Sequence, residues 1–324
     1  MPDKRELGQY YTQSNPFGHQ LFYEWLNLVP KDRPFLEPFA GSNNIPKMIK
    51  DLGYDFKWVC YDINPPKDNA FPDAPVCERD TLDCFPIGYH VIVTNPPYLG
   101  KSSARRRHID YKWDEDDLYK VCLSIMLKNC PYVAAIIPES FVTAGIHTDK
   151  LFGIISLGHK MFDDTDCPVC LALFTPDGTE NIKMYSDETY LGLFHELKNT
   201  EITGATSEVK WVFNDKNGNI GVKTVDSNDG PDCKFFNGEL ISPDDIKISS
   251  RAFTRISGLP DGTDLDTFLA NCNNTLKEYR QTTKDVMMTS FKGLRKDGLY
   301  RRRLDFKTVR HILDYTLKNV KKTT

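Results

Sequence analysis

Short apolar runs alternate with amphipathic segments along the first half of the chain. The runs are "PFLEPFAGS" at 34–42, "KWVCYDI" at 57–63, "YHVIVTN" at 89–95 and "VAAIIP" at 133–138. The first reads as a short strand entering a tight turn, and the others are typical of strands buried on both faces. The segments "NIPKMIKDLG" at 44–53 and "DDLYKVCLSIMLKN" at 116–129 have helical spacing. This alternation predicts an α/β fold with a parallel, Rossmann-like doubly wound sheet.

An amphipathic helix is expected before the first strand. Asn15 is the predicted N-cap and Pro16 suits the first helical position. The apolar residues that recur at helical spacing are Phe17, Leu21, Phe22, Trp25 and Leu28.

The amino-acid composition of the chain changes after Pro176. Residues 178–290 are richer in Asn, Asp, Gly and Thr, and "NDKNGN" and "SNDGPD" read as turns between short strands. A length of 324 residues with 40% hydrophobic content suits one large or two ordinary domains. We therefore expect one domain at 1–177 and a second at 178–324.

Charge is distributed unevenly along the chain. Residues 291–324 contain eleven Lys and Arg against three Asp, a net of +8 in a chain whose total is −4. A basic end on an acidic body predicts a partner that carries phosphate groups. A solvated basic helix is the alternative explanation.

The nine cysteines are scattered, and the start "MPDKRELGQYYTQ" lacks the pattern of a signal peptide. No apolar run is long enough to span a membrane. These features predict a soluble, reduced, cytoplasmic protein. The pair Cys167 and Cys170 lies in "CPVCLALF", which favours a buried strand over a redox or zinc site, so no metal is expected.

The candidate chemistry begins at "VIVTNPPYLGKSSARRR", 91–107, where a predicted strand stops on Asn-Pro-Pro-Tyr. Ligands of open parallel sheets bind outside the carboxyl ends of the strands. Two prolines fix the backbone there, so the amide of Asn95 and the carbonyl of Pro96 can point at one guest. Two acceptors suit a group with two N–H donors, such as an exocyclic amine or a carboxamide, and Tyr98 offers a face for stacking. A rigid turn without chemistry is the alternative.

A cofactor site is indicated upstream of this motif. Gly41 and Ser42 lie in the turn after the first strand, where backbone can approach a nucleoside closely. Asp62 ends the next strand, a position from which an acid can accept ribose hydroxyls. Asp80 precedes the strand that leads to Asn95.

With this order of motifs, the sequence resembles the γ class of N6-adenine DNA methyltransferases, which use S-adenosylmethionine. The segments that carry the resemblance are "GQYYT" at 8–12, "EPFAGS" at 37–42, "YDI" at 61–63, "RD" at 79–80, "NPPY" at 95–98, "IIPESF" at 136–141 and "MFDDTDCPVCLALF" at 161–174. It covers residues 8 to about 176, and it implies a catalytic domain followed by a C-terminal target-recognition domain.

The resemblance implies two sets of site residues. The cofactor set is Tyr11, Thr12, Glu37, Pro38, Phe39, Gly41, Asp62, Ile63, Asp80, Thr81 and Asn95. The catalytic set is Asn95, Pro96, Pro97, Tyr98 and Phe162. It also implies that the target adenine flips out of the duplex, that Tyr98 and Phe162 clamp it, and that Asn95 and Pro96 orient its amine for direct methyl transfer.

The cofactor loop departs from the family pattern at one place. The family commonly has a second glycine, whereas this chain continues from Gly41 with Ser42, Asn43 and Asn44. Asparagine tolerates a left-handed backbone better than most residues, so the turn is expected to survive.

Two basic segments are the expected DNA contacts. The first is Arg105, Arg106 and Arg107, and the second, within 293–310, includes Arg295, Arg301, Arg302 and Arg303. They are expected to contact phosphates of double-stranded DNA, with an arginine of the second segment reading guanine. A monomer on DNA and a companion restriction endonuclease for the same site are further expectations.

Three other functions stay open on the sequence. An RNA adenine-N6 methyltransferase would use the same pocket, and a protein-glutamine methyltransferase would use the same motif on a carboxamide. The extra domain of the glutamine enzymes precedes the cofactor loop, whereas here it follows the catalytic motif. A DNA-binding module that lost catalysis is the third alternative.

Overall fold

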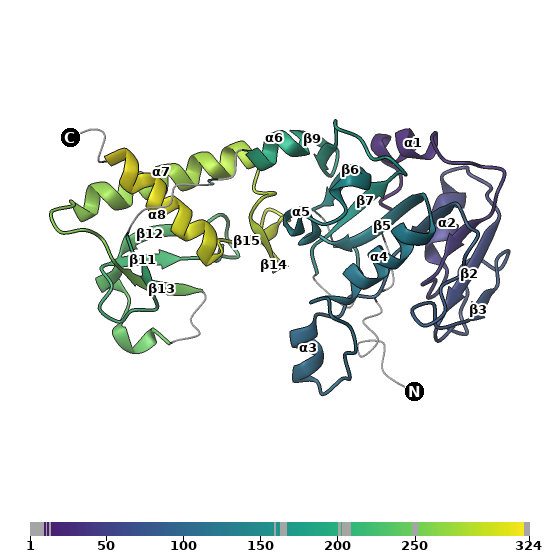
Figure 1. Cartoon of the computed structure of the whole chain (residues 1–324), viewed down its shortest axis with the longest axis horizontal. Coiled ribbons are helices and arrows are strands. Elements are labelled where there is room, and N and C mark those ends of the chain that lie inside the picture. The colour runs from purple at the N-terminus through teal and green to yellow at the C-terminus, as the bar shows by residue number, and fades with distance from the viewer. Residues whose placement is uncertain are drawn as a thin grey trace. The chain divides into compact units, whose positions relative to one another are not determined.

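The computed structural model describes residues 10, 12, 14–158, 160–162, 167–199, 202, 209–247 and 252–320. The chain forms two compact units, Met1–Leu193 and Phe194–Thr324 (Figure 1).

The first unit is built on a nine-stranded sheet in the order β3-β2-β1-β4-β5-β7-β6-β8-β9. Its strands are β1 Phe35–Glu37, β2 Trp58–Asp62, β3 Val76–Glu78, β4 Val91–Thr94, β5 Tyr132–Pro138, β6 Leu151–Leu157, β7 Val169–Phe174, β8 Lys183–Ser186 and β9 Thr189–Leu193. The first five in spatial order pair in parallel. The predicted α/β fold is therefore confirmed, and the apolar runs do form these strands.

The sheet is mixed, so the predicted parallel pairing holds for β3, β2, β1, β4 and β5 but not for β7 and β9. Strand β7 inserts between β5 and β6 and runs antiparallel to both. Successive strands such as β6 and β7 can pair antiparallel without the crossover that parallel neighbours need. Strand β8 pairs parallel with β6, and β9 pairs antiparallel with β8. The sheet thus continues past residue 177, and the compact units divide between Leu193 and Phe194.

The helical segments of this unit are α1 Gln20–Leu26, α2 Asn44–Asp51, α3 Lys101–Arg106, α4 Leu118–Asn129, α5 Phe141–Ala144 and the 3₁₀ turn η1 Thr148–Lys150. Helix α4 packs on β5, and Asp117 caps it by accepting from the amide of Tyr119. The core includes β4 and β7, whose residues are all buried. Cys170 is buried in β7, so the predicted strand around the cysteine pair is confirmed.

Helix α1 begins later than the sequence predicts. His19 is its N-cap and accepts from the amide of Leu21 at 2.9 Å. Asn15 instead accepts from the amide of Phe17, which closes a separate turn before the helix. Leu28 lies beyond the helix end and is 50% exposed, so its predicted place among the apolar positions of the helix is wrong.

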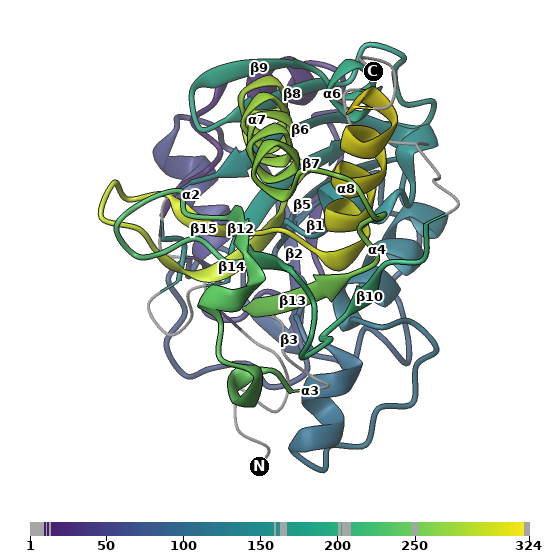
Figure 2. The ribbon, with the colours of Figure 1, turned by 90° about the vertical axis from the view of Figure 1, so that its left-hand side faces the viewer.

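The second unit contains a four-stranded antiparallel sheet in the order β10-β13-β11-β12 (Figure 2). The strands are β10 Val212–Phe213, β11 Ile220–Lys223, β12 Lys234–Asn237 and β13 Phe253–Ser257. The other elements are α6 Phe194–Asn199, η2 Gly238–Leu240, η3 Pro243–Asp245, α7 Leu265–Thr283 and α8 Phe306–Val320. The strands β14 Thr289–Leu294 and β15 Tyr300–Arg303 form a separate hairpin.

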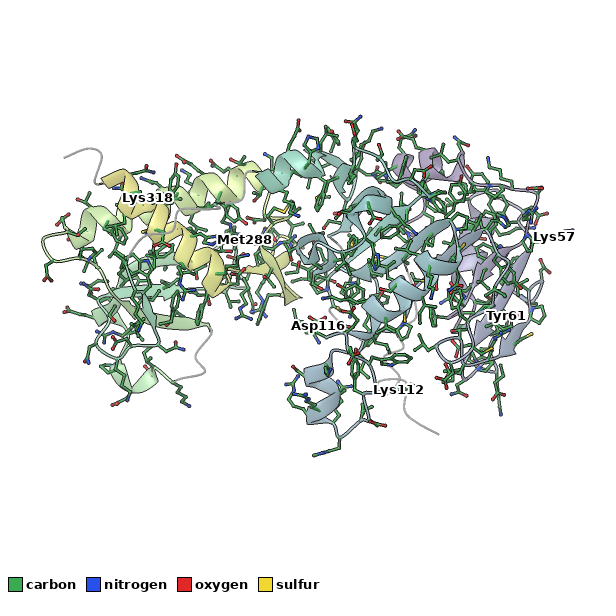
Figure 3. The ribbon with its side chains drawn as sticks, in the orientation of Figure 1. Lys57, Tyr61, Lys112, Asp116, Met288 and Lys318 are labelled. Atoms are coloured by element: carbon green, nitrogen blue, oxygen red, sulfur yellow. The ribbon has the colours of Figure 1, made fainter. Side chains whose placement is uncertain are left out.

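Helix α7 packs against α8 and β12. Met288, labelled in Figure 3, is buried just before β14, and Lys318 lies in the last turn of α8. The turn "NDKNGN" lies between β10 and β11, as predicted. Within the described part of the chain, no helix has the length and apolar character needed to cross a membrane.

Candidate functional site

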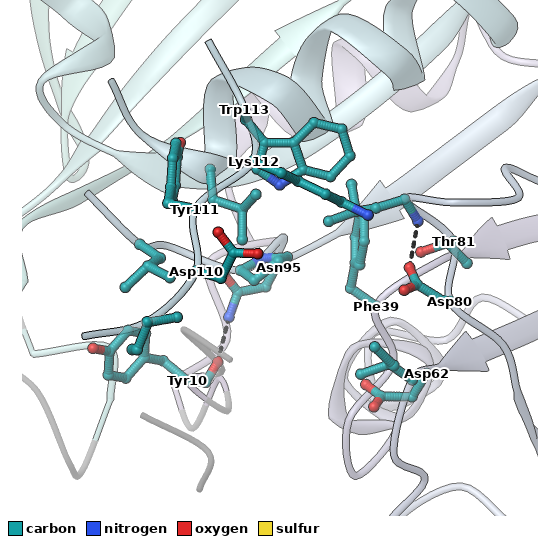
Figure 4. A pocket seen from close by; sticks show the side chains of 16 residues that line it. Tyr10, Phe39, Asp62, Asp80, Thr81, Asn95, Asp110, Tyr111, Lys112 and Trp113 are labelled. Carbon is teal, nitrogen blue, oxygen red and sulfur yellow. Dashed lines mark hydrogen bonds between the residues drawn. The ribbon is translucent and has the colours of Figure 1, made fainter. Parts of the chain in front are cut away.

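A pocket lies at the carboxyl ends of the central parallel strands. Strand β1 ends at Glu37, β2 at Asp62 and β4 at Thr94, directly before Asn95. These strands are neighbours in the sheet, so the residues that follow them meet at one edge. The pocket has a volume of about 330 Å³ (Figure 4). The predicted site residues that line it are Phe39, Asp62, Ile63, Asp80, Thr81, Asn95 and Pro97.

The turn after β1 keeps its shape with a single glycine. Gly41 has a φ of 49°, and Asn43 adopts the left-handed conformation with a φ of 66°. The side-chain amide of Asn43 donates to the carbonyl of Ala74 at 2.7 Å, which holds it in this conformation. Asn43 thus adopts the left-handed backbone that asparagine was expected to tolerate.

Asp62 supports the same turn from β2. Its carboxylate accepts from the backbone amides of Gly41 and Asn64, each at 2.8 Å. The side chain is buried and lines the pocket. The turn at Gly41 and the acid Asp62, predicted as separate parts of a cofactor site, are therefore directly hydrogen-bonded to each other.

Glu37 lies behind the pocket and is only 1% exposed. Its carboxyl group accepts from the amide of Phe39 at 3.0 Å and from the hydroxyl of Thr94. Burial raises the pKa of Glu37 to about 8, despite these two hydrogen bonds. Glu37 is therefore mostly protonated at neutral pH. Its hydrogen bond to the amide of Phe39 holds the backbone of a residue that lines the pocket.

The segment after β3 supplies Asp80 and Thr81. Asp80 accepts from the amides of Leu82 and Asp83 at 3.0 and 3.2 Å. The hydroxyl of Thr81 donates to the carbonyl of Pro38 at 3.0 Å. This hydrogen bond ties the segment after β3 to the turn after β1. Pro38, a predicted cofactor residue, does not line the pocket, but its carbonyl takes part in this contact.

Asn95 is hydrogen-bonded to Tyr10 and Thr12, two described residues near the start of the chain. Its Nδ2 donates to the backbone carbonyl of Tyr10 at 2.6 Å and to the hydroxyl of Thr12 at 3.1 Å. Its Oδ1 accepts from the hydroxyl of Tyr98, which also lies 2.6 Å from the carbonyl oxygen of Ile136. Burial raises the pKa of Tyr98 well above its usual value, so this hydroxyl keeps its proton.

The two predicted clamp residues are in contact. The ring centroids of Tyr98 and Phe162 are 6.1 Å apart, with an edge-to-face angle of 70°. Tyr98 is 6% exposed and Phe162 is 1% exposed. Pro96 is buried and, like both rings, does not belong to the pocket lining. Tyr11 lies outside the described residues.

The segment Ile109–Trp113 was not predicted from the sequence, although all five of its residues line the pocket. Lys112 and Asp116, in the stretch between α3 and α4, are labelled in Figure 3. The ammonium group of Lys112 lies 2.7 Å from the carboxylate of Asp83, which ties the segment to the turn that follows β3. Alternating apolar and polar residues in "IDYKW" were the available signal. Tyr10, Leu82, Leu99 and Leu118 also line the pocket and were not predicted.

The predicted DNA-contacting arginines have different environments. Arg105 and Arg106 are exposed on α3, and Arg107 is the exposed C-cap. The guanidinium of Arg301 lies 5.0 Å from the ring centroid of Phe291 across the β14–β15 hairpin. Arg302 donates to the hydroxyl of Ser290 at 2.7 Å, and Arg303 ends the same strand.

Arg295 has a different setting from the other arginines. It is 7% exposed and pairs with Asp297 at 2.8 Å and Asp226 at 3.4 Å. Its guanidinium belongs to an internal ion-pair network of the second unit.

The pocket has the donors and acceptors that a nucleoside cofactor would need. Asp62 lines the pocket with a buried carboxylate, a group that accepts hydrogen bonds from hydroxyl groups of a ligand. Phe39, Ile63 and Leu82 add apolar surface for a planar ring. The volume is within the range of small-molecule sites. S-adenosylmethionine therefore fits the residues that are present.

Neither a protein-family model nor a curated protein matches this chain. The type I restriction-modification methyltransferase subunit from Streptococcus thermophilus is a similar solved structure, with 13% identity, 55% of this chain and 47% of that chain covered, and a TM-score of 0.36. The M protein of the type I restriction enzyme EcoKI has 13% identity, coverages of 86% and 72%, and a TM-score of 0.38.

A third similar structure is described as a predicted N6-adenine-specific DNA methylase from Listeria monocytogenes, with 16% identity, coverages of 52% and 53%, and a TM-score of 0.29. This chain spans about half the length of the Streptococcus and Listeria proteins. With such identities and TM-scores, none of these likenesses carries an argument about what this chain does.

Proposed function

We propose that this protein is an S-adenosylmethionine-dependent DNA methyltransferase of the γ class that modifies N6 of adenine within a short recognition sequence. The first unit would carry the cofactor and the reaction, and the second would recognise the target. The proposal rests on the residues of the site and on the order of the sequence motifs.

The observation that carries the proposal is the fixed orientation of the Asn95 amide. Both protons of its Nδ2 are given to Tyr10 and Thr12, so its oxygen is the atom that remains for other contacts. That oxygen accepts from Tyr98, and an amide oxygen has a second lone pair. The substrate group that suits an acceptor is a donor, such as the amine of adenine.

The residues that would hold the cofactor lie at or just after the carboxyl ends of β1, β2 and β3. Asp62 would accept the ribose hydroxyls, and Asp80 with Thr81 would lie at the nucleobase. Phe39 and Ile63 would contribute apolar surface to the bound nucleoside. S-adenosylmethionine, when bound, supplies an electrophilic methyl group.

The chain's part in the reaction is to position a weak nucleophile. The lone pair of an aromatic amine is delocalised into the ring. Acceptors at Asn95 and Pro96 would draw both amine protons toward them and return electron density to nitrogen. The amine nitrogen would form the new N–C bond as the bond between the methyl group and sulfur breaks, with S-adenosylhomocysteine as the leaving group, and the surplus amine proton would pass to solvent. Rate would come from alignment and from fixed dipoles.

Base flipping would bring adenine to this site, because N6 is hidden in the stacked duplex. Arg105 and Arg106 on α3 follow the catalytic motif closely and are exposed, which suits contact with phosphates. Arg301, Arg302 and Arg303 on β15 are the proposed contacts of the second unit. We also propose double-stranded DNA as the partner, bound by a monomer, with a companion restriction endonuclease acting on the same sequence.

The test of the proposed function is transfer of a labelled methyl group to three acceptors offered separately. They are duplex DNA without adenine methylation, structured RNA, and a peptide that contains glutamine. The proposal predicts label in DNA, recovered as N6-methyladenine. Label confined to RNA or to the peptide would reassign the substrate, and cofactor binding without transfer to any acceptor would contradict the proposed reaction.

A further inference from the structure

Tyr10 completes a cluster of three aromatic rings at the proposed base site. Its ring stacks on Tyr98 with a centroid distance of 5.9 Å and an interplanar angle of 28°. It also lies 6.0 Å from the ring of Phe162. Each of the three rings therefore contacts the other two, and the face of Tyr98 on which a base would stack is covered by Tyr10.

The contact between Tyr98 and Phe162 leaves no slot for a planar base. In an edge-to-face pair, the edge of one ring rests on the face of the other, with no layer between them. Both side chains are buried, at 6% and 1% exposure, whereas Tyr10 is partly exposed and lines the pocket. Of the three rings, Tyr10 is the one that can leave toward the pocket.

Tyr10 is also bonded to the proposed catalytic amide. Its backbone carbonyl accepts from Nδ2 of Asn95 at 2.6 Å. One residue thus occupies the stacking position with its ring and orients Asn95 with its carbonyl. A change of the χ1 rotamer of Tyr10 would move the ring away while its backbone carbonyl stays bonded to Asn95.

We propose that Tyr10 holds the place of the target base in the DNA-free enzyme and is displaced by the base when it enters. This inference rests on the proposed function, because it takes Tyr98 and Phe162 as the walls of the base site. Tyr10 is a positioning residue in this scheme. Its ring keeps the apolar walls covered and keeps the adenine site closed until a base competes for the same stacking surface.

The test compares Tyr10→Ala with Tyr10→Phe, using free adenine as the probe. Removing the ring opens the stacking surface, whereas phenylalanine keeps it covered. Because Tyr10 also lines the pocket assigned to the cofactor, S-adenosylhomocysteine is present at saturation to keep adenine out of that site in every protein compared. We expect Tyr10→Ala to bind adenine about tenfold more tightly than Tyr10→Phe and wild type, as measured by ligand-observed NMR. Equal affinities in all three proteins would overturn the proposal.

A second measurement follows the wild-type chain and needs only the conservative variant Tyr10→Phe, for assignment. Fluorine NMR of protein labelled with 3-fluorotyrosine reports on Tyr10, whose resonance is assigned by its loss in Tyr10→Phe. Saturating adenine should shift this resonance toward that of a solvent-exposed ring, and an unmoved resonance would contradict displacement. Neither measurement requires methyl transfer, so the placeholder role and the proposed reaction can fail separately.

Discussion

The side-chain amide of Asn95 donates to the hydroxyl of Thr12 over 3.1 Å, although 83 positions separate the two residues in sequence. Thr12 is itself fixed, because its carbonyl accepts from the side chain of Asn44 at 2.9 Å. Asn44 begins α2, directly after the turn that contains Gly41 and Asn43. The orientation of the proposed catalytic amide is therefore linked through Thr12 to the turn that would hold the cofactor.

Replacement of Thr12 by valine should slow methyl transfer. Valine keeps the size of threonine but has no oxygen, so one proton of the Asn95 amide loses its partner. A buried donor without a partner costs about 1–3 kcal/mol, which corresponds to a roughly tenfold or larger loss of kcat. Thr12→Ser retains the hydroxyl and is the matched control. If Thr12→Val and Thr12→Ser turn over equally, this bond does not orient the amide.

Asn95→Ala should remove most methyl transfer while leaving cofactor affinity within several-fold. We expect kcat to fall by at least about 10²-fold, the effect of removing a fixed polar group from a reacting centre. Calorimetry with S-adenosylmethionine checks that the cofactor site is intact. Normal turnover by this variant would refute the assigned role.

Asn95→Asp is a sharper version of the same experiment. The shape of the side chain is kept, but the two donors that bond Tyr10 and Thr12 are replaced by an acceptor oxygen. That oxygen would face the carbonyl of Tyr10. We expect a loss of kcat as large as that of the alanine variant, and wild-type activity in Asn95→Asp would show that the amide orientation is unimportant.

Stability of the chain should fall between pH 4.5 and 8 because of Glu37. Its pKa is raised by burial from 4.5 to about 8 in the folded state. The folded protein therefore binds this proton more tightly than the unfolded chain, and rising pH favours unfolding by up to about 1.4 kcal/mol per pH unit in this window.

Glu37→Gln removes the titrating group and should flatten this part of the pH profile of the unfolding midpoint. Glu78→Gln makes the same chemical change at an exposed position of β3 and serves as the control. An unchanged slope in Glu37→Gln, measured by calorimetry at several pH values, would contradict the assignment.

Asp226 should be essential for the stability of the second unit. Its buried carboxylate pairs with Arg280 at 2.8 Å and Arg295 at 3.4 Å, and it accepts from the amide of Arg302 on β15. Burial alone would raise the pKa of Asp226, but Arg280 and the backbone donors outweigh it and hold the pKa well below its usual range.

Asp226→Asn leaves two guanidinium groups with one partner fewer in a buried network. We expect the free energy of unfolding to fall by about 3–5 kcal/mol. Asp229→Asn is the matched control, because Asp229 pairs with Lys296 on the surface and should contribute less than about 1 kcal/mol. Equal stability of the two variants would mean that the network does not hold the β14–β15 hairpin.

Replacement of Arg301, Arg302 and Arg303 by alanine should weaken DNA binding and flatten its dependence on salt. Each phosphate contact contributes roughly −0.9 to the slope of log affinity against log salt concentration. The double variant Lys47→Ala, Lys50→Ala removes positive charges from α2, where both lysines already pair with aspartates. If the slope of log affinity against log salt concentration changes more in this control than in the arginine variant, DNA does not bind at β15.

Much of the first unit could be predicted because local rules act on short segments. Apolar runs and turn residues located β1, β2, β4 and β5 with their ends, and the shared edge of parallel strands then brought Asp62 and Asn95 to one pocket. The mixed part of the sheet could not be predicted in this way. The position of β7 depends on long-range pairing with β5, which leaves no local signal.

The contacts between residues of the site were harder to predict than the identity of the residues themselves. The Tyr10 ring against Tyr98 depends on how a distant segment crosses the pocket, and spacing in the sequence does not encode it. The basic segment at 293–310 was recognised, but the burial of Arg295 depends on Asp226, 69 positions away. Charge counts identify a basic segment without telling which of its arginines are used for internal pairing.

The most direct test of the central claim is to incubate the purified protein with S-adenosylmethionine and genomic DNA that lacks adenine methylation, and then to sequence the DNA with detection of modified bases. The account predicts N6-methyladenine at one adenine of a single short motif. DNA that remains unmodified under conditions in which the cofactor binds would contradict it.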